Sequence, residues 1–260
     1  ALQQRFGDRA EIIHSDYAGA AATLAAAGEQ MDMVLLDLGV SSPQLDQSER
    51  GFSFRNDGPL DMRMDQATGE TAADIVNTMG ERELADLIYE YGEERKSRRI
   101  AKAIVRQRPF ETTAELADVV AAAVGRHQDI HPATRTFQAL RIAVNDELGQ
   151  LQAVLPDLIT LLKPAGRIAV ISFHSLEDRI VKDFFRQEAR DCICPSSQPI
   201  CTCDHVATLK LLARRPLKGT QDAINPRARS AKLRAAEKLT PKRGLHDISH
   251  QKPNSSRPTH

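Results

Sequence analysis

Short apolar runs bounded by turn residues predict strands at several places in this chain. Residues 33–38 form a run too short for a helix, and residues 168–173 follow a turn that contains Pro164 and Gly166. We expect a further short strand at residues 11–15. Because helical sequence alternates with these runs, the pattern predicts a parallel, doubly wound α/β sheet.

The stretch before the last of these strands has apolar residues in steps of three and four from Phe137 to Leu162. That spacing predicts a long helix with one buried stripe, and Pro156 should kink it or begin a second helix there. A further amphipathic helix is expected at residues 176–187.

More than a hundred residues separate the second expected strand from the third, far more than one crossover needs. This insert begins with a loop over residues 50–65 and then has helical spacing around Leu84 and around Leu116. Thr112 and Glu115 form a capping box before the second of these helices. We therefore expect a small helical domain inside the α/β domain.

The formal net charge is zero, but charge is distributed very unevenly along the 260 residues. Residues 205–260 hold thirteen Lys or Arg against three Asp or Glu, so the remainder is acidic to the same extent. A basic tail on an acidic body suits a polyanionic partner, because neutralising phosphates releases counterions. The alternative is a disordered, solubilising tail, and we expect disorder over residues 239–260.

The absence of membrane and export signals, together with the cysteines, bears on where the protein is located and on whether it binds a metal ion. The chain has no run of eighteen apolar residues and no signal-peptide pattern, so we expect no membrane segment and a cytoplasmic location. Four cysteines lie close together in the sequence, at Cys192, Cys194, Cys201 and Cys203. Four thiolates so spaced can bind a structural zinc, with free or redox-paired thiols as the alternative.

Two strand ends carry candidates for chemistry, because ligands of open α/β sheets bind beyond the carboxyl ends of the strands. Asp37 ends the second strand, with an ordinary turn or capping role as the alternative. His174 and Ser175 follow the third strand. A hydrolase pair is disfavoured there, because adjacent residues of an extended chain point apart and no G-x-S-x-G elbow occurs.

A basic run without any acid occupies residues 95–108 of the insert. On a helix its charges would spread over more than one face, so a solvated surface accounts for some of them. The others are candidates for phosphate contacts. Their positions are Arg95, Lys96, Arg98, Arg99, Lys102, Arg106 and Arg108.

Seven motifs, in this order, resemble one known family. They are D-L-G-V-S-S-P-Q-L-D from Asp37, E-R-G-F-S-F from Glu49, D-G-P-L-D-M-R-M-D from Asp57, Y-G-E-E-R from Tyr91, H-P-A-T-R-T-F-Q-A-L-R from His131, S-F-H-S-L-E-D-R from Ser172 and N-P-R-A-R-S from Asn225. From the first residues to about Lys238 the chain is similar to the bacterial 16S rRNA (cytosine-N4)-methyltransferase family, called RsmH or MraW.

The resemblance implies a class I, Rossmann-like sheet that uses S-adenosylmethionine (SAM), with an inserted helical domain. It divides the chain into part of the methyltransferase core at 1–65, a helical substrate-recognition domain at 66–135 and the rest of the core at 136–238. It also implies N4 methylation of a decoding-region cytosine, so 16S rRNA in the small ribosomal subunit is the expected partner. The oligomeric state is left open, a homodimer included.

In this family SAM is contacted by a Gly-rich loop, an acid ending the next strand, an aromatic after the third strand, and the D-L-G-V-S-S-P-Q loop. The matching positions here are Tyr17, where the family usually has Phe, with Asp37 and Gln44. No G-x-G occurs in the chain. The resemblance therefore implies that the Gly-rich loop and its acid would precede Ala1, in a missing N-terminal segment.

For the substrate, we expect Asp37 to border the pocket for the cytosine amine, while Phe52 or Phe54 stacks on a flipped base. Hydrophobic anchoring of their loop is the alternative for the two phenylalanines. His174, which is either structural or in contact with RNA, joins Arg227 and Arg229 as candidate RNA contacts. The competing functions are a non-catalytic RNA-binding fragment and an amino-methyltransferase for another nucleic acid.

Overall fold

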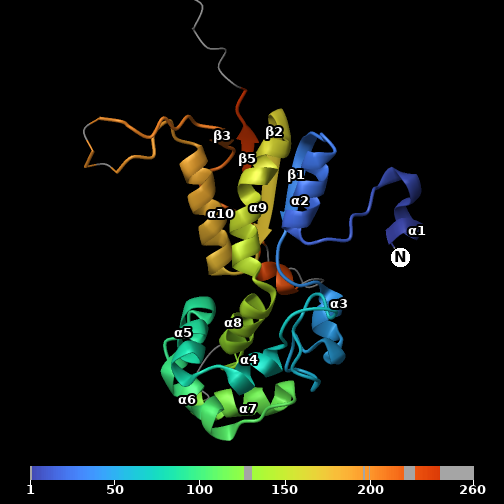
Figure 1. The fold of residues 1–260 in the computed structure, drawn as a ribbon, viewed down its shortest axis with the longest axis vertical. Helices are drawn as coiled ribbons and strands as arrows, with labels where there is room; N and C mark the ends of the chain where they lie inside the picture. The colour runs from blue at the N-terminus through green and yellow to red at the C-terminus, as the bar shows by residue number, and fades with distance from the viewer. Residues whose placement is uncertain (1, 126–130, 196, 199, 220–225, 241–260) are drawn as a thin grey trace, which may run out of the picture.

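A single mixed sheet forms one part of the molecule (Figure 1). The structure is a computed structural model that describes residues 2–125, 131–195, 197–198, 200–219 and 226–240. Within these residues the strand order is β1–β2–β5–β3, with β4 paired to β5. The strands are β1 (Met31–Asp37), β2 (Leu162–Ser172), β3 (Leu209–Leu211), β4 (Leu217–Lys218) and β5 (Lys232–Lys238).

The sheet is only partly parallel. β1 and β2 run parallel and confirm the strands expected near residues 33–38 and 168–173, whereas β5 runs antiparallel to β2, β3 and β4. The strand expected at residues 11–15 is wrong. That segment is irregular and joins helix α1 (Leu2–Phe6) to α2, away from the sheet, so it has no strand with which to pair (Figure 1).

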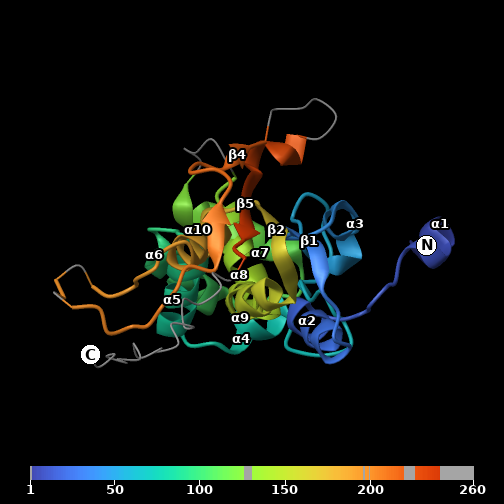
Figure 2. The same ribbon diagram turned by 90° about the horizontal axis from the view of Figure 1, so that it is seen from above.

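Three helices lie side by side against the sheet: α2 (Tyr17–Ala26), α9 (Glu147–Leu161) and α10 (Ser175–Glu188) (Figures 1 and 2). α10 confirms the amphipathic helix expected after the last strand. Leu36 of β1 and Val170 of β2 face these helices and are buried with Leu155 of α9 and Phe185 of α10. This sheet core positions the ends of β1 and β2.

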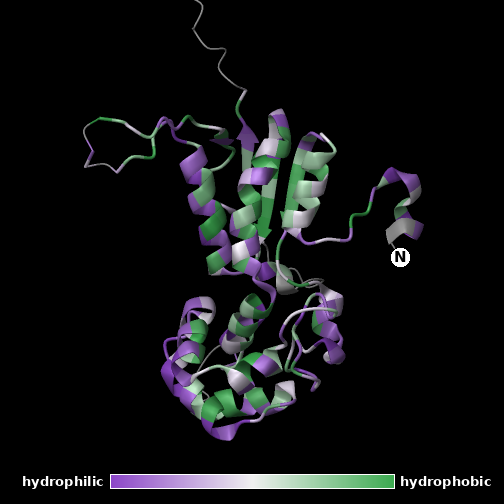
Figure 3. Cartoon of the chain, in the orientation of Figure 1, coloured by the Kyte–Doolittle hydropathy of each residue, from purple (hydrophilic) through white to green (hydrophobic). Residues whose placement is uncertain are grey.

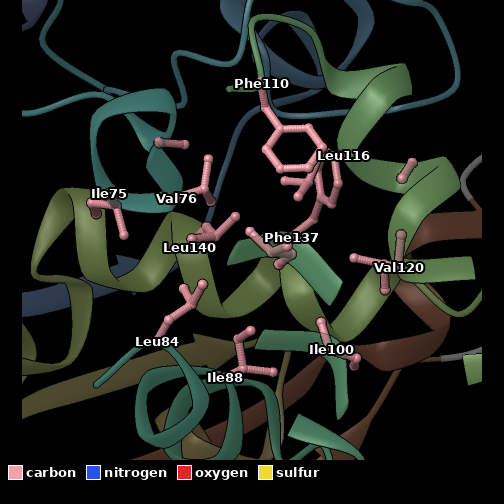
Figure 4. Packing of buried hydrophobic residues seen from close by; sticks show 14 of the residues in the cluster. Ile75, Val76, Leu84, Ile88, Ile100, Phe110, Leu116, Val120, Phe137 and Leu140 are labelled. Carbon is pink, nitrogen blue, oxygen red and sulfur yellow. The ribbon is translucent and has the colours of Figure 1, made fainter. Parts of the chain in front are cut away.

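A second, separate core lies in the helical part of the molecule. Helices α4 (Ala72–Thr78), α5 (Glu81–Gly92), α6 (Ser97–Gln107), α7 (Thr113–Val124) and α8 (Thr134–Asn145) surround it. Figure 4 shows side chains from all five helices meeting around Phe137 and Leu140. Hydrophilic residues line the outer side of α6 (Figure 3). The capping box of Thr112 and Glu115 at the start of α7 is confirmed.

The apolar stripe from Phe137 to Leu162 is divided between the two cores. The helix breaks at Asp146, which takes the left-handed conformation with φ 45° and ψ 41°, and Pro156 lies inside α9. A second helix beginning at Pro156 is therefore wrong, because the second helix begins at Glu147, whereas a kink at Pro156 stays a prediction. Apolar side chains before Asp146 fill the helical core, and those after it fill the sheet core. The three-and-four spacing of apolar residues therefore continues across a point where the helix itself is interrupted.

The remaining short elements are α3 (Ser42–Asp46) and the 3-10 turns η1 (Gly7–Arg9), η2 (Ser48–Arg50) and η3 (Pro226–Ser230). No helix in the described ranges is both long and apolar enough to cross a membrane. The disorder expected at residues 239–260 falls, from residue 241 onward, outside the described residues.

Candidate active site

A hollow lies where the carboxyl ends of β1 and β2 meet the helical part. Because the two strands are parallel neighbours, Asp37 and Ser172 end at the same edge of the sheet. Side chains from both parts of the molecule line the hollow: Tyr17, Leu38, Gly39, Met64, Asn145, Glu147, Gln150, Leu151 and Glu177.

Asp37 is an exposed carboxylate at the end of β1. The backbone around it is fixed, because the N–H of Leu38 donates to Ile171 O at 3.0 Å and Leu38 is buried. Gly39 then turns the chain with φ +84°, a conformation that favours glycine. Within the described part of the chain the Asp37 side chain makes no hydrogen bond or ion pair, so its oxygens are free to accept hydrogen bonds from a ligand.

Tyr17 begins α2 and forms an aromatic wall of the hollow. Burial raises the pKa of its hydroxyl, and the negative charges of Glu147, Glu177 and Asp37 raise it further, outweighing the opposite effect of Arg141. Three carboxylates thus act on one point of the lining. The surroundings of the hollow thus combine these carboxylates with the Arg141 guanidinium that pairs with Glu147.

Asn145 and Glu147, on either side of the helix break, hold neighbouring segments together at the hollow. The Asn145 amide donates to Met62 O at 2.8 Å and accepts from the N–H of Met64 at 2.7 Å. Both oxygens of Glu147 accept from the Arg141 guanidinium, at 2.7 and 2.8 Å. The loop of the D-G-P-L-D-M-R-M-D motif is thereby fixed to the end of α8, beside the hollow.

The S-F-H-S-L-E-D-R motif builds the start of α10. His174 is its N-cap, and Glu177 accepts from the N–H groups of Phe173 at 2.8 Å and His174 at 3.3 Å. The Nε2 atom of His174 lies 3.2 Å from Glu177 Oε1, without hydrogen-bond geometry. Burial raises the pKa of Glu177, but the His174 ring and the Phe173 amide lower it overall. The structural alternative for His174 thus has direct support, and its RNA contact stays a prediction.

A second contact between the two parts involves Glu93, the C-cap of α5. Its carboxylate accepts from Ser175 Oγ and from the Arg179 guanidinium, the latter at 2.9 Å. The Ser175 hydroxyl lowers the pKa of Glu93, with Arg179 acting in the same direction. The Y-G-E-E-R motif is therefore joined directly to the S-F-H-S-L-E-D-R motif.

The other predicted cofactor and base contacts lie in the loop after β1. Gln44 Oε1 accepts from the N–H and Oγ of Ser41, at 2.8 and 2.9 Å, so it caps α3. Phe52 is 6% exposed, and Phe54 packs against His131 and Phe137 with centroid distances of 4.6 and 4.8 Å. These positions favour the anchoring alternative for both phenylalanines, and base stacking stays a prediction.

Some of the basic residues predicted to contact phosphates bind other groups of the protein, and the others are exposed. Lys96 donates to Val124 O, Arg98 pairs with Asp86, and Arg108 donates to backbone carbonyls in the last turn of α4 and at its C-cap. Arg95, Arg99, Lys102 and Arg106 are exposed. Arg229 is also exposed, in η3, and the backbone of Arg227 lies in the same turn. Because Lys232 is paired with Ser172 at the end of β2, this turn lies at the same edge of the sheet as the hollow. Asn225 lies outside the described residues.

No local pattern in the sequence indicates that Asn145, Glu147 and Gln150 line the site. They were assigned to the middle of one long helix, whereas the break at Asp146 brings them to the hollow. A run of three polar residues, from Asn145 to Glu147, between two apolar repeats is the one signal that could have located the break.

The four cysteines lie outside this site, on the segment between α10 and β3, and are close enough together to hold a metal ion. Backbone N–H groups of Ile193 and His205 lower the pKa of Cys203 to about 6. The four sulfur atoms are thus placed to hold one metal ion, and this cluster is separate from the hollow.

Comparison with known proteins agrees with this geometry. The MraW methylase family model matches residues 1–239. "Ribosomal RNA small subunit methyltransferase H" of Geobacter sp. (strain M21) is 55% identical over 243 residues, which cover 90% of this chain and 78% of that protein. The protein of the same name from Heliobacterium modesticaldum is 50% identical over 244 residues, with the same two shares. The chain belongs to the MraW methylase family.

Proposed function

We propose that this protein transfers the methyl group of SAM to the N4 amine of a decoding-region cytosine in 16S rRNA of the small ribosomal subunit. The observation that carries the proposal is the acidic hollow at the ends of the two parallel strands, built from the motifs of the family. The fold proposed is a class I, Rossmann-like methyltransferase sheet with an inserted helical domain. Because α8 packs in the helical core, we place the end of that insert at Asp146 rather than at residue 135.

The residues of the hollow fit the chemistry of SAM. SAM carries a positive sulfonium and an ammonium group, and both are favoured by the field of Asp37, Glu147 and Glu177 at Tyr17. The Tyr17 ring adds a polarisable face against which a cation can rest. Asp37 offers carboxylate oxygens that no other described group occupies.

Asp37 would act on the cytosine amine through its hydrogen-bond acceptors. The amine is a poor nucleophile because its nitrogen lone pair is delocalised into the ring. A carboxylate that accepts a hydrogen bond from the N4 amine favours a more tetrahedral nitrogen and can hold the proton that the amine loses on methylation. The bound sulfonium supplies an already activated methyl group, so the chain's own task is to position the amine in line with it.

Exposed basic groups, one at the edge of the sheet that carries the hollow and three on α6, suit the phosphates of the RNA. Arg229 lies in the turn at the same edge of the sheet as the hollow, and Arg99, Lys102 and Arg106 are exposed on α6. Such contacts position a nucleic acid without reading its sequence. Replacing these basic residues should weaken RNA binding and reduce its salt dependence, while SAM binding is kept.

The test compares Asp37→Ala with Asp32→Ala. Asp32 lies on the same strand and is exposed, with Lys163 as its partner at 3.0 Å, so it is a matched control away from the hollow. We expect Asp37→Ala to lower methyl transfer from labelled SAM to small ribosomal subunits by at least about a hundredfold, and Asp32→Ala to keep it. The methylated nucleoside is identified by mass spectrometry. Near-normal turnover of Asp37→Ala would refute its role, and preferential methylation of naked DNA would refute the substrate.

A further inference from the structure

Four cysteines come together on the segment that connects α10 to β3. Cys192 and Cys194 lie on the arm that leaves α10, and Cys201 and Cys203 lie on the arm that returns to β3. Figure 1 shows this segment extending away from the sheet, in orange. The four sulfur atoms all lie within 4.8 Å of one another. The two arms therefore approach each other through their cysteine Sγ atoms.

The segment has no hydrophobic core of its own to hold this arrangement. No described residue between Phe185 and Leu209 is buried, and Ile200 and Val206 are 73% and 63% exposed. Its base is closed by Thr208, whose backbone N–H donates to Glu188 O at 2.8 Å. A short segment without a core generally needs a disulfide or a metal ion to keep one conformation.

The sulfur–sulfur distances distinguish between these two crosslinks. Sγ atoms are 3.5 Å apart for Cys201 and Cys203, 3.9 Å for Cys192 and Cys203, and 4.0 Å for Cys194 and Cys201. A disulfide would require about 2.05 Å, and all four cysteines are free. Four sulfurs bound tetrahedrally to zinc at about 2.3 Å lie about 3.8 Å apart. These three distances are close to the spacing in a tetrahedral metal site and far from that in a disulfide.

Backbone amides also point at the sulfurs, as expected for thiolate ligands. The N–H of Ile193 donates to Cys203 Sγ and that of Thr202 donates to Cys194 Sγ, both at 3.5 Å. Each bond joins one arm of the segment to a sulfur of the other arm. Such bonds stabilise the negative charge that a metal-bound sulfur carries and fix its orientation.

We infer that Cys192, Cys194, Cys201 and Cys203 bind one structural zinc ion that crosslinks the two arms of this segment. Four sulfur ligands leave no open position on zinc, so the ion would stabilise structure and take no part in methyl transfer. The site is separate from the hollow and does not depend on the proposed function. Its failure and the failure of that function are distinguishable, because one is measured by metal content and the other by methylation.

The experiment measures metal in the untagged protein purified under reducing conditions. We expect about one zinc per chain by mass spectrometry of the metal content, and near none in the double variant Cys194→Ser/Cys201→Ser. His205→Ala is the matched control, because His205 is a neighbouring potential ligand whose Nε2 lies 3.2 Å from Gln187 O. It should retain the zinc.

Cobalt substitution of the unaltered protein keeps the test valid if the double variant does not fold. Four thiolates around cobalt should give the charge-transfer and visible bands of a tetrahedral sulfur site, and added zinc should remove them. Zinc retained by the double serine variant would overturn the inference. So would bound iron in place of zinc, disulfides in the freshly purified protein, or a cobalt complex without thiolate bands.

Discussion

Strands β1 and β5 belong to one sheet, but in each of them the hydropathy of the sequence differs from what its position in the sheet would suggest. β1 is apolar, yet Met33 and Leu35 are 64% and 60% exposed. β5 reads K-L-R-A-A-E-K, yet it lies inside the sheet between β2 and the pair β3 and β4. Hydropathy alone would place these two strands the other way round.

β5 can lie inside the sheet because each of its charged side chains has an ion-pair or hydrogen-bond partner. Arg234 and Lys232 both bind Asp178 of α10, Glu237 pairs with Arg167 of β2, and Lys238 donates to carbonyls at the end of α9. A charged residue can thus occupy an inner strand when each charge has a partner. The exposed face of β1 has no such constraint, because nothing in the described chain covers it.

The largest effect should come from breaking the Arg234–Asp178 pair. Arg234 Nε and Nη2 donate to the two carboxylate oxygens at 2.6 and 3.2 Å, and both side chains are largely buried. Arg234→Met leaves that carboxylate with Lys232 alone, and we expect the free energy of unfolding to fall by about 3 kcal/mol. Chemical denaturation measures it. Arg167→Met is the matched control, because its pair with Glu237 is exposed and should contribute less than about 1 kcal/mol.

The pH dependence of the same pair has a definite sign. Burial raises the pKa of Asp178, but Arg234 and Lys232 lower it overall, so its pKa is lower in the folded than in the unfolded protein. The pair therefore stabilises the fold above the unfolded pKa near 4, and that stability is lost as the pH falls through the lowered folded pKa. Arg234→Met should reduce this loss in acid. An acid denaturation profile identical to that of the unaltered protein would contradict the assignment.

A smaller effect is expected at the end of β5. Lys238 Nζ donates to Leu162 O at 2.7 Å and Thr160 O at 3.2 Å, where α9 ends. Its charge is favoured there by the helix dipole, although burial lowers its pKa. Lys238→Met should lower the free energy of unfolding by about 1.5 kcal/mol. Lys210→Met, on the exposed part of β3, is the control and should change it by less than about 0.5 kcal/mol.

These contacts explain which parts of the fold could be predicted from the sequence. β1, β2 and α10 were predicted because their apolar patterns reflect local geometry. β5 was missed because its stability depends on Asp178 and Arg167, partners that are distant in sequence. The strand expected at residues 11–15 had the right local pattern but no neighbour, since a strand also needs hydrogen-bond partners.

The same limit applies to the site. The parallel neighbours β1 and β2 made it possible to predict that Asp37 and the S-F-H-S-L-E-D-R motif lie at one edge. The participation of Glu147 and Asn145 could not be predicted, because it follows from the left-handed turn at Asp146 and from contacts with a loop more than eighty residues away. Packing of Phe54 against Phe137 is likewise a long-range contact that no local pattern indicates.

The smallest effect is expected on the exposed face of β1. Leu35→Ser removes a side chain that is 60% exposed, so the free energy of unfolding should change by less than about 0.5 kcal/mol. Leu36→Ala is the matched substitution on the opposite face, where the side chain is 8% exposed, and should cost about 3 kcal/mol. If both variants lost similar stability, another surface would have to cover β1 in solution. A melting temperature that rises with protein concentration would then identify that surface as a second copy of the chain.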